Sequence, residues 1–124
     1  ISVTLYDQIP GRTYPKKGFK RLSQLVKPGP ANTFVTLDEH PDSIDDAVFH
    51  SVGGANLATA IFRNVPASYH YGGGANFSFA DGHSEIHKWK DQRTKLPVIF
   101  QVQRNVAVRG SVDYEWLNER LPWE

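Results

Sequence analysis

The segment from His83 to His87 reads His-Ser-Glu-Ile-His and places two histidines and a glutamate at alternate positions. On a helix, histidines four positions apart are neighbours and can share a zinc ion. On a strand, at about 3.3 Å per residue, they lie roughly 13 Å apart and can hardly bind one ion from a single flat strand. A strand therefore leaves Glu85 with only one of the two histidines as a candidate ligand pair, or else a polar face that binds no metal.

A glycine triplet, Gly72 to Gly74, follows shortly after His70. A phosphate-binding loop would lead from a strand into a helix and would carry a lysine, whereas this triplet leads into a predicted strand. The triplet therefore favours a tight backbone bend over a phosphate site. His70 joins His83 and Glu85 as a candidate catalytic residue, although the chain has no Gly-x-Ser-x-Gly nucleophile elbow.

Residues 38–46, which we call the acidic segment, contain five acidic side chains and one serine. Carboxylates this close repel one another unless solvent or a cation relieves the repulsion, and Ca²⁺ prefers such oxygen ligands. The spacing is not that of an EF-hand. The candidate calcium ligands are Asp38, Asp42, Ser43, Asp45 and Asp46. The alternative is a solvated loop in which Asp42 or Ser43 caps a turn.

The composition is typical of one globular domain: 124 residues, 40% hydrophobic and 12% aromatic. A net charge of +1 without a clustered basic run argues against nucleic-acid binding. The chain has no cysteine, so it can form neither a disulfide nor a thiolate metal site, and export is permitted. No apolar run is long enough to span a membrane, and the absence of Met at position 1 predicts that the chain was trimmed, processed or cut from a longer one.

The segment from Ala75 to Trp89 predicts a β-hairpin, because Asp81-Gly82 lies between two alternating stretches. We expect these two residues to form the whole turn, with Phe77 opposite Ile86. The buried face would then hold Phe77, Phe79 and Ile86, and the opposite polar face Asn76, Ser78, His83, Glu85 and His87.

The remaining elements are predicted to be short. Strands are expected over residues 2–6, 33–37, 47–52 and 98–108, a helical turn over 19–26, and a loop or short helix over 56–62. Ser111 can cap a helix that ends before Pro122 and docks Trp116 and Leu117 onto the sheet. We therefore expect a single α+β domain over residues 1–124.

The chain resembles the prepilin-type proteins named for an H-X9-DG motif in the stretches TFVTLDEHPDSIDD, PASYHYGGGANFSFADGHSEIHKW and DYEWLNER. That family is related to the major pseudopilin of type II secretion. In this chain ten residues, rather than nine, separate His70 from Asp81. The resemblance implies a pilin-like antiparallel sheet with short helices, which normally packs on a long N-terminal helix that is missing from this chain. It also implies a calcium-binding loop, for which the acidic segment is the natural candidate.

Three functions follow from these patterns. The first is the structural head of a pseudopilin-like filament, in the periplasm or at the cell surface, with other pseudopilin-like subunits as partners. The membrane would be reached only through the missing helix. The second is a small metal-dependent hydrolase acting on an ester or lactone, with His83, Glu85 or His70 near an ion that activates water. The third is a carbohydrate- or ligand-binding module that uses Trp89 or Tyr71 as a stacking surface.

Overall fold

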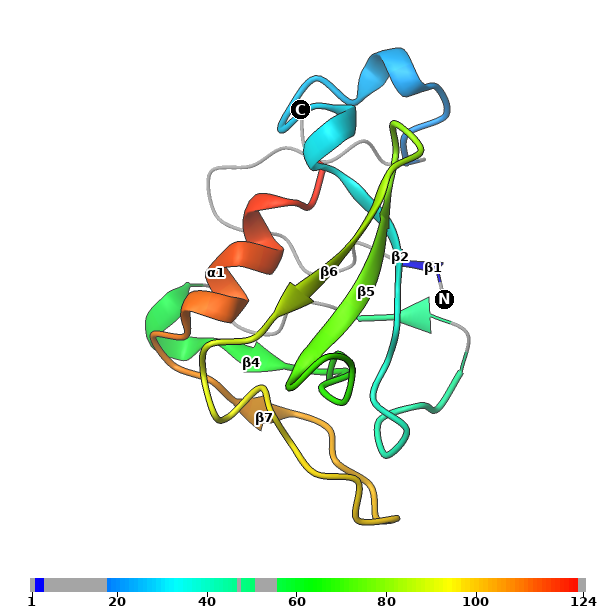
Figure 1. The fold of residues 1–124 in the computed structure, drawn as a ribbon. Coiled ribbons are helices and arrows are strands. Elements are labelled where there is room, and N and C mark those ends of the chain that lie inside the picture. Colours follow the sequence, from blue (N-terminus) through cyan, green and yellow to red (C-terminus); the bar gives the residue numbers. More distant parts are fainter. Residues whose placement is uncertain (1, 4–17, 47, 51–55, 123–124) are drawn as a thin grey trace.

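The computed structural model describes residues 2–3, 18–46, 48–50 and 56–122. A five-stranded sheet has the order β3 (Val48–Phe49), β1 (Ser2–Val3), β2 (Phe34–Leu37), β5 (Gly74–Phe79) and β6 (Ser84–Lys88). Its neighbours pair antiparallel except for β1 and β3, which are parallel. A second, two-stranded sheet joins β4 (Ile61–Phe62) to β7 (Val106–Ala107). The expected small antiparallel sheet with short helices is confirmed (Figure 1).

The helices are short, as the frequent glycines and prolines predict. They are the single turns η1 (Leu22–Gln24), η2 (Pro30–Asn32) and η3 (Leu57–Thr59), and the α-helix α1 (Val112–Glu119). Ser111 caps α1 as predicted, since its side chain accepts hydrogen bonds from the backbone of Asp113 and Tyr114. None of the helices in the described part of the chain could cross a membrane.

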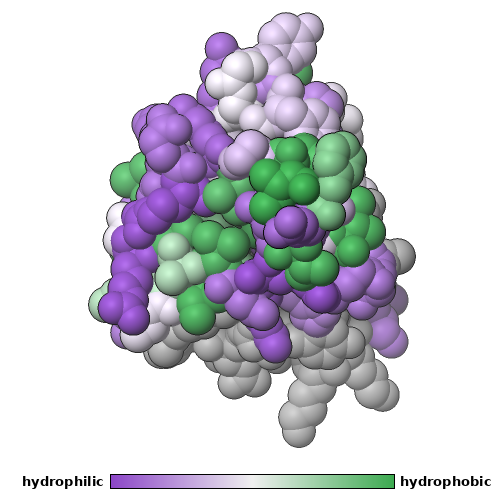
Figure 2. Space-filling model, turned by 90° about the horizontal axis from the view of Figure 1, so that it is seen from below, coloured by the Kyte–Doolittle hydropathy of each residue, from purple (hydrophilic) through white to green (hydrophobic). Residues whose placement is uncertain are grey.

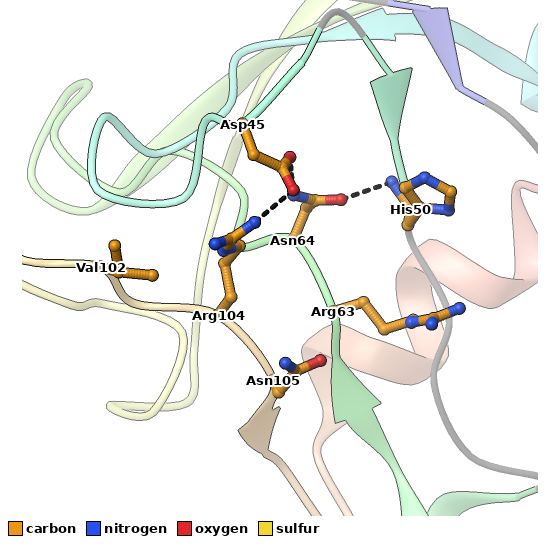
Figure 3. A pocket seen from close by; sticks show the side chains of 7 residues that line it. All are labelled: Asp45, His50, Arg63, Asn64, Val102, Arg104 and Asn105. Atoms are coloured by element: carbon orange, nitrogen blue, oxygen red, sulfur yellow. Dashed lines mark hydrogen bonds and ion pairs between the residues drawn. The ribbon is translucent and has the colours of Figure 1, made fainter.

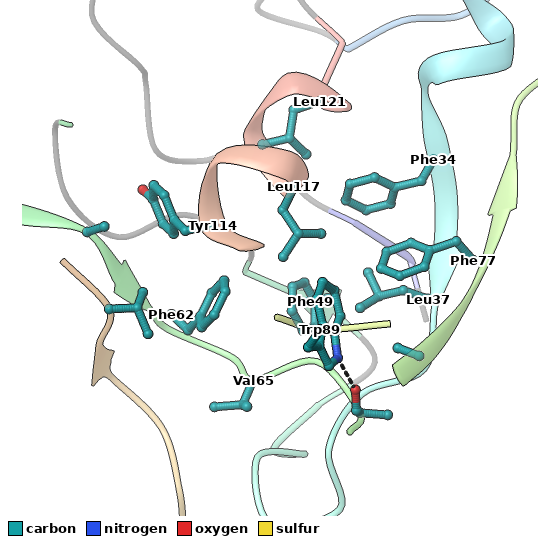
Figure 4. Packing of buried hydrophobic residues seen from close by; sticks show 14 of the residues in the cluster. Phe34, Leu37, Phe49, Phe62, Val65, Phe77, Trp89, Tyr114, Leu117 and Leu121 are labelled. Atoms are coloured by element: carbon teal, nitrogen blue, oxygen red, sulfur yellow. Dashed lines mark hydrogen bonds between the residues drawn. The ribbon is translucent and has the colours of Figure 1, made fainter. Parts of the chain in front are cut away.

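The hydrophobic core lies between the five-stranded sheet and α1 (Figure 4). The ring of Phe77 is near its centre, edge-to-face with Phe34 at 5.4 Å and with Trp116 at 5.1 Å between ring centroids. Leu117 is fully buried and Trp116 packs against the cluster. The predicted docking of α1 onto the sheet is therefore confirmed.

The hairpin forms where the sequence predicts it, but its turn is one residue longer. Phe79 accepts a hydrogen bond from the backbone of Gly82 and donates one to the carbonyl of His83, so residues 80–82 form a three-residue loop. Gly82 has a φ of 96°, which suits the left-handed position that closes such a loop. The predicted two-residue turn is wrong.

The extra residue exchanges the two faces of β6. Phe77 lies opposite Glu85 and not opposite Ile86, because a slip of one residue turns every side chain to the other face. Ile86 is consequently 43% exposed, which corrects its predicted burial. His83, Glu85 and His87, predicted on the opposite polar face, point to the same side as Phe77.

Burial of Trp89 explains why the longer turn is preferred. Trp89 lies two residues after His87, so in an extended chain both side chains point to the same side. Its indole is buried, and Nε1 donates a hydrogen bond of 2.7 Å to the carbonyl of Ala67. The shorter turn would have buried Ile86 and turned Trp89 outward. An indole covers more apolar surface than an isoleucine side chain, so the register that buries it has the lower free energy.

The glycine triplet serves the close approach of two backbone segments. A Cβ atom at Gly74 would lie only 2.4 Å from the carbonyl oxygen of His87, so no larger residue fits at the start of β5. The backbone of His70 is bonded in both directions to that of Gly74, which confirms the predicted tight bend.

Two predicted strands differ from the structure. Of residues 98–108, only Val106–Ala107 form a strand, and residues 97–103 form a projecting loop that we call the finger. Of the strand predicted over residues 2–6, Ser2–Val3 are observed and residues 4–6 lie outside the described residues.

The corrected register makes a testable distinction between two apolar residues of the hairpin. Phe79→Ala should lower the free energy of unfolding by about 3–5 kcal/mol, because Phe79 is buried. Ile86→Ala should cost less than about 1 kcal/mol, because the side chain is half in solvent. Urea unfolding of both variants measures this. Equal, large losses of unfolding free energy in both variants would mean that Ile86 is buried, as the two-residue turn predicts.

Candidate functional site

The acidic segment connects to the hairpin through Asp38. The side chain of Asn76, on β5, donates a hydrogen bond of 2.8 Å to Asp38 Oδ2. Nε2 of His70 lies 3.0 Å from the same oxygen. Asp38 thus joins two of the stretches that carry the family resemblance, and His70 has a carboxylate partner despite the changed spacing.

The next residues of the acidic segment turn into the interior. Ser43 is fully buried, and its hydroxyl donates to Glu39 Oε1 at 3.0 Å and accepts from the backbone of Val65 at 2.8 Å. The side chain of Asn64 adds a donor to the carbonyl of Ser43. These bonds attach the acidic segment to the chain that follows β4.

Glu39 is the least satisfied residue of this cluster. It is only 4% exposed, and its Oε2 has no hydrogen-bond partner among the described residues. Burial raises the pKa of Glu39, and the negative charges of Asp45 and Asp46 add to the rise, while the bond from Ser43 opposes it. The protonated acid is therefore favoured in the folded protein relative to an ordinary glutamate.

His40 lies fully buried beside Glu39 and holds the chain before the finger. Its Nε2 lies 3.0 Å from the carbonyl oxygen of Leu96, and its Nδ1 accepts from the backbone of Asp42 at 3.2 Å. A neutral ring with its proton on Nε2 satisfies both bonds. The hydroxyl of Ser68 donates to the same carbonyl of Leu96 at 2.7 Å.

Asp42 holds the finger itself. Its carboxylate accepts hydrogen bonds from the backbone of Ile99 at 2.7 Å and of Phe100 at 3.1 Å, and from the side chain of Gln103 at 2.8 Å. These bonds, that from Ile99 first, hold the pKa of Asp42 below its usual value. Gln103 also donates to the carbonyl of Pro97, which closes the base of the finger.

Near the end of the segment, Asp45 borders an open polar pocket of ≈ 390 Å³ (Figure 3). Asp45 pairs with Arg104 and accepts a bond from Asn64, and Asn64 in turn accepts from the backbone of His50. The pocket is lined by Asp45, His50, Arg63, Asn64, Val102, Arg104 and Asn105. Asp46 accepts from the backbone of Val48 at the start of β3 and does not line the pocket.

The five predicted calcium ligands therefore contact different parts of the chain. Asp38 contacts the hairpin and Asp42 the finger, whereas Ser43 and Asp45 share Asn64 as a partner. Within the described residues, no group of three or more His, Asp or Glu side chains is placed to hold a metal ion. Calcium binding by the segment stays a prediction.

The candidate catalytic residues lie at two separate places. His70 is beside Asp38, whereas Nε2 of His83 lies 3.7 Å from Glu85 Oε2 and its Nδ1 bonds to Asp81. The ring of His83 also stacks on Phe79, with 4.3 Å between the centroids. The hydrolase, like its catalytic residues, stays a prediction.

His87 is part of an aromatic stack. Its ring lies nearly parallel to that of Trp116, with 3.7 Å between the centroids, and the guanidinium carbon of Arg120 lies 4.0 Å from the centroid of a Trp116 ring. Burial lowers the pKa of His87. Of the two proposed stacking residues for carbohydrate, Trp89 is buried and does not offer a surface, while Tyr71 is exposed.

Sequence reasoning missed Glu39, His40, Asn64 and Gln103 as organising residues. One signal for the first two was present: the apolar strand β2 runs directly into them, so the chain is still inside the protein when they follow. The roles of Asn64 and Gln103 had no local signal, because their partners are distant in sequence.

No family model matches the sequence, and no curated protein or solved structure matches it either. Membership of the prepilin-type family is therefore a proposal.

The buried acid predicts a pH dependence. The pKa of Glu39 is higher in the folded protein than in the unfolded chain, where it is near 4.5, so Glu39 stays protonated in the folded protein at pH values at which it is ionised in the unfolded chain. Its contribution to stability therefore falls as the pH rises above 4.5. The unfolding free energy of wild type minus that of Glu39→Gln should fall in the same direction, measured by urea unfolding at several pH values.

Glu115→Gln is the matched control, because Glu115 is an exposed acid in the first turn of α1. The unfolding free energy of Glu115→Gln should depend on pH as that of wild type does, so its difference from Glu39→Gln should still fall as the pH rises. A difference between wild type and Glu39→Gln that rises with pH would show that Glu39 is stabilised as a carboxylate.

Proposed function

We propose that this domain is the globular head of a pseudopilin-like filament protein of type II secretion, exported to the periplasm or the cell surface. The observation that carries the proposal is the bond of Asp38 to Asn76 and His70. It gives the residues of two family-like stretches a common role, which is to fasten the acidic segment to the hairpin.

The other polar residues of these stretches support the same interpretation. Ser43, His40 and Asp42 each bond to a different segment of the chain. Ser43 and His40 are fully buried, and buried polar residues that are hydrogen-bonded fix one conformation, which a subunit of a regular assembly needs. The mainly antiparallel sheet with a docked α1 agrees with a pilin-like head, a likeness that is part of the proposal.

Export can be tested with cysteine labelling, because residues 1–124 contain no cysteine. Ala31→Cys, at an exposed position of η2, should react with a membrane-impermeant maleimide in intact source cells that express the gene with its upstream region. Wild type supplies the unlabelled control, and Ala60→Cys, at a buried position, shows that the labelled protein is folded. Labelling of Ala31→Cys only after lysis would contradict the proposal.

We also propose that calcium stabilises this head through the acidic segment. A cation held by Asp45 and its neighbours would offset their mutual repulsion. A ligand at 100 times its Kd adds about 2.7 kcal/mol to the free energy of unfolding, or several degrees in melting temperature. Millimolar Ca²⁺ should therefore raise the melting temperature and a chelator should reverse the rise.

The matched variants are Asp45→Asn, inside the segment, and Asp81→Asn, in the hairpin loop. The quantity to compare is the difference in melting temperature between calcium and chelator, because Asp45→Asn also loses its bond to Arg104. The difference should vanish in Asp45→Asn and persist in Asp81→Asn. A wild-type melting temperature that calcium does not change would reject the calcium proposal and leave the export test unaffected.

A further inference from the structure

Strand β6 lies at an edge of the five-stranded sheet. It pairs with β5 on one side, and no other strand among the described residues pairs with its outer side (Figure 1). The N–H of Trp89 and the carbonyl of His83 bond to the β5 side. Backbone groups alternate along an antiparallel strand, so those of Ser84, Ile86 and Lys88 turn away from β5. All three residues are exposed, and in the described part of the chain these backbone groups have no partner on the outer side.

This edge has little protection against pairing with another strand. Natural sheet edges are blunted by proline, by a β-bulge, by a covering segment or by charges that repel an incoming strand. The strand β6 has no proline, and its register with β5 is regular throughout. Its single lysine, Lys88, opposes pairing only with a strand that brings another cation opposite to it.

The order of side chains along β6 makes the strand complementary to itself. In an antiparallel pair related by a two-fold axis at Ile86, the two copies of Ile86 face each other. Ser84 then lies opposite Lys88, and their outward backbone groups form hydrogen-bonded pairs. Glu85 lies opposite His87 in the closer, non-hydrogen-bonded pairs, where a carboxylate meets an imidazole. Backbone bonds, charge and the apolar contact of the two isoleucines thus fit in one register.

Neighbouring two-fold registers lack this match. The register centred on Glu85 places two carboxylates opposite each other, and that centred on Lys88 places two ammonium groups opposite each other, which is unfavourable. The register centred on His87 leaves Glu85 opposite the indole of Trp89. We propose that β6 is a self-association edge and that its occupant is β6 of a second copy of this chain, paired antiparallel about Ile86. The inference goes beyond the filament proposal and does not need it.

The finger is also exposed and apolar, but it shows no such pattern. Phe100 is 92% exposed and has a φ of 57°, in the left-handed region that bulky residues rarely adopt. Figure 2 looks onto this end of the molecule from below and shows apolar surface interrupted by polar side chains. The finger therefore supplies a control surface for association that is merely hydrophobic.

Two substitutions of Ser84 should change the association in opposite directions. Ser84→Lys brings like charges opposite each other at Lys88 of the second copy, whereas Ser84→Glu brings opposite charges together. Sedimentation velocity of the purified chain over a series of concentrations should show reversible dimers of wild type. The dissociation constant should rise about tenfold in Ser84→Lys, since the two-fold axis repeats the repulsion, and should fall in Ser84→Glu.

Two controls separate the edge from general effects. Ala31→Lys, at an exposed position of η2, changes the net charge as Ser84→Lys does and should associate like wild type. Phe100→Asn removes the exposed ring at a backbone conformation that asparagine tolerates, and should also associate like wild type. Monomeric wild type at all concentrations would overturn the proposal. Association that Phe100→Asn abolishes and Ser84→Lys leaves intact would overturn it too, and would make the finger the contact.

Disulfide formation tests the register directly. At the two-fold axis the Cα atoms of the two residues 86 would lie about 5.5 Å apart, a separation that a disulfide spans. Ile86→Cys should therefore form a covalent dimer under mild oxidation, because the chain has no other cysteine. Val35→Cys is the matched control, since Val35 is 47% exposed but lies on β2, inside the sheet. Equal cross-linking of the two variants, or none in Ile86→Cys, would reject the pairing about Ile86.

Discussion

Polar side chains that enter a protein interior must have a partner for nearly every donor and acceptor, and this constraint organises the whole domain. The acidic segment follows an apolar strand into the core, and its side chains then bond outward in several directions. Asp38 reaches the hairpin, Ser43 the chain after β4, His40 the chain just before the finger, and Asp42 the finger itself. Segments far apart in sequence are thereby placed around one cluster.

The same constraint explains why so many acids can share a short stretch of chain. Each carboxylate that bonds to backbone N–H groups or to an arginine is separated from its neighbours by those partners, so their repulsion is reduced. Glu39 differs from these carboxylates. It keeps one buried oxygen without a partner among the described residues, and burial raises its pKa.

Asp42 links the interior to the surface of the molecule. Its backbone carbonyl accepts from Gln103, while its carboxylate fixes the strained turn at Phe100. The residue that organises the fold therefore also determines how the exposed apolar ring is presented.

Local patterns in the sequence determined those elements that depend on interactions between neighbouring residues. The cap at Ser111, the strand Phe34–Leu37 and the position of the hairpin follow from neighbouring residues, and all three are observed. The sequence also predicted that α1 would dock through Leu117, because a short helix is stable only when its apolar side packs on something.

Tertiary structure decided the features that depend on competition between distant groups. Asp81-Gly82 fits a two-residue or a three-residue loop, and the burial of Trp89 favours the longer one, which turns His83 and His87 to the side of Phe77. The acids looked alike in sequence, but their partners, from Asn76 to Gln103, come from chain that no local pattern connects to them. Hydrogen-bond partners of buried side chains are set by which segments meet in space, and that is decided by the packing of the whole core.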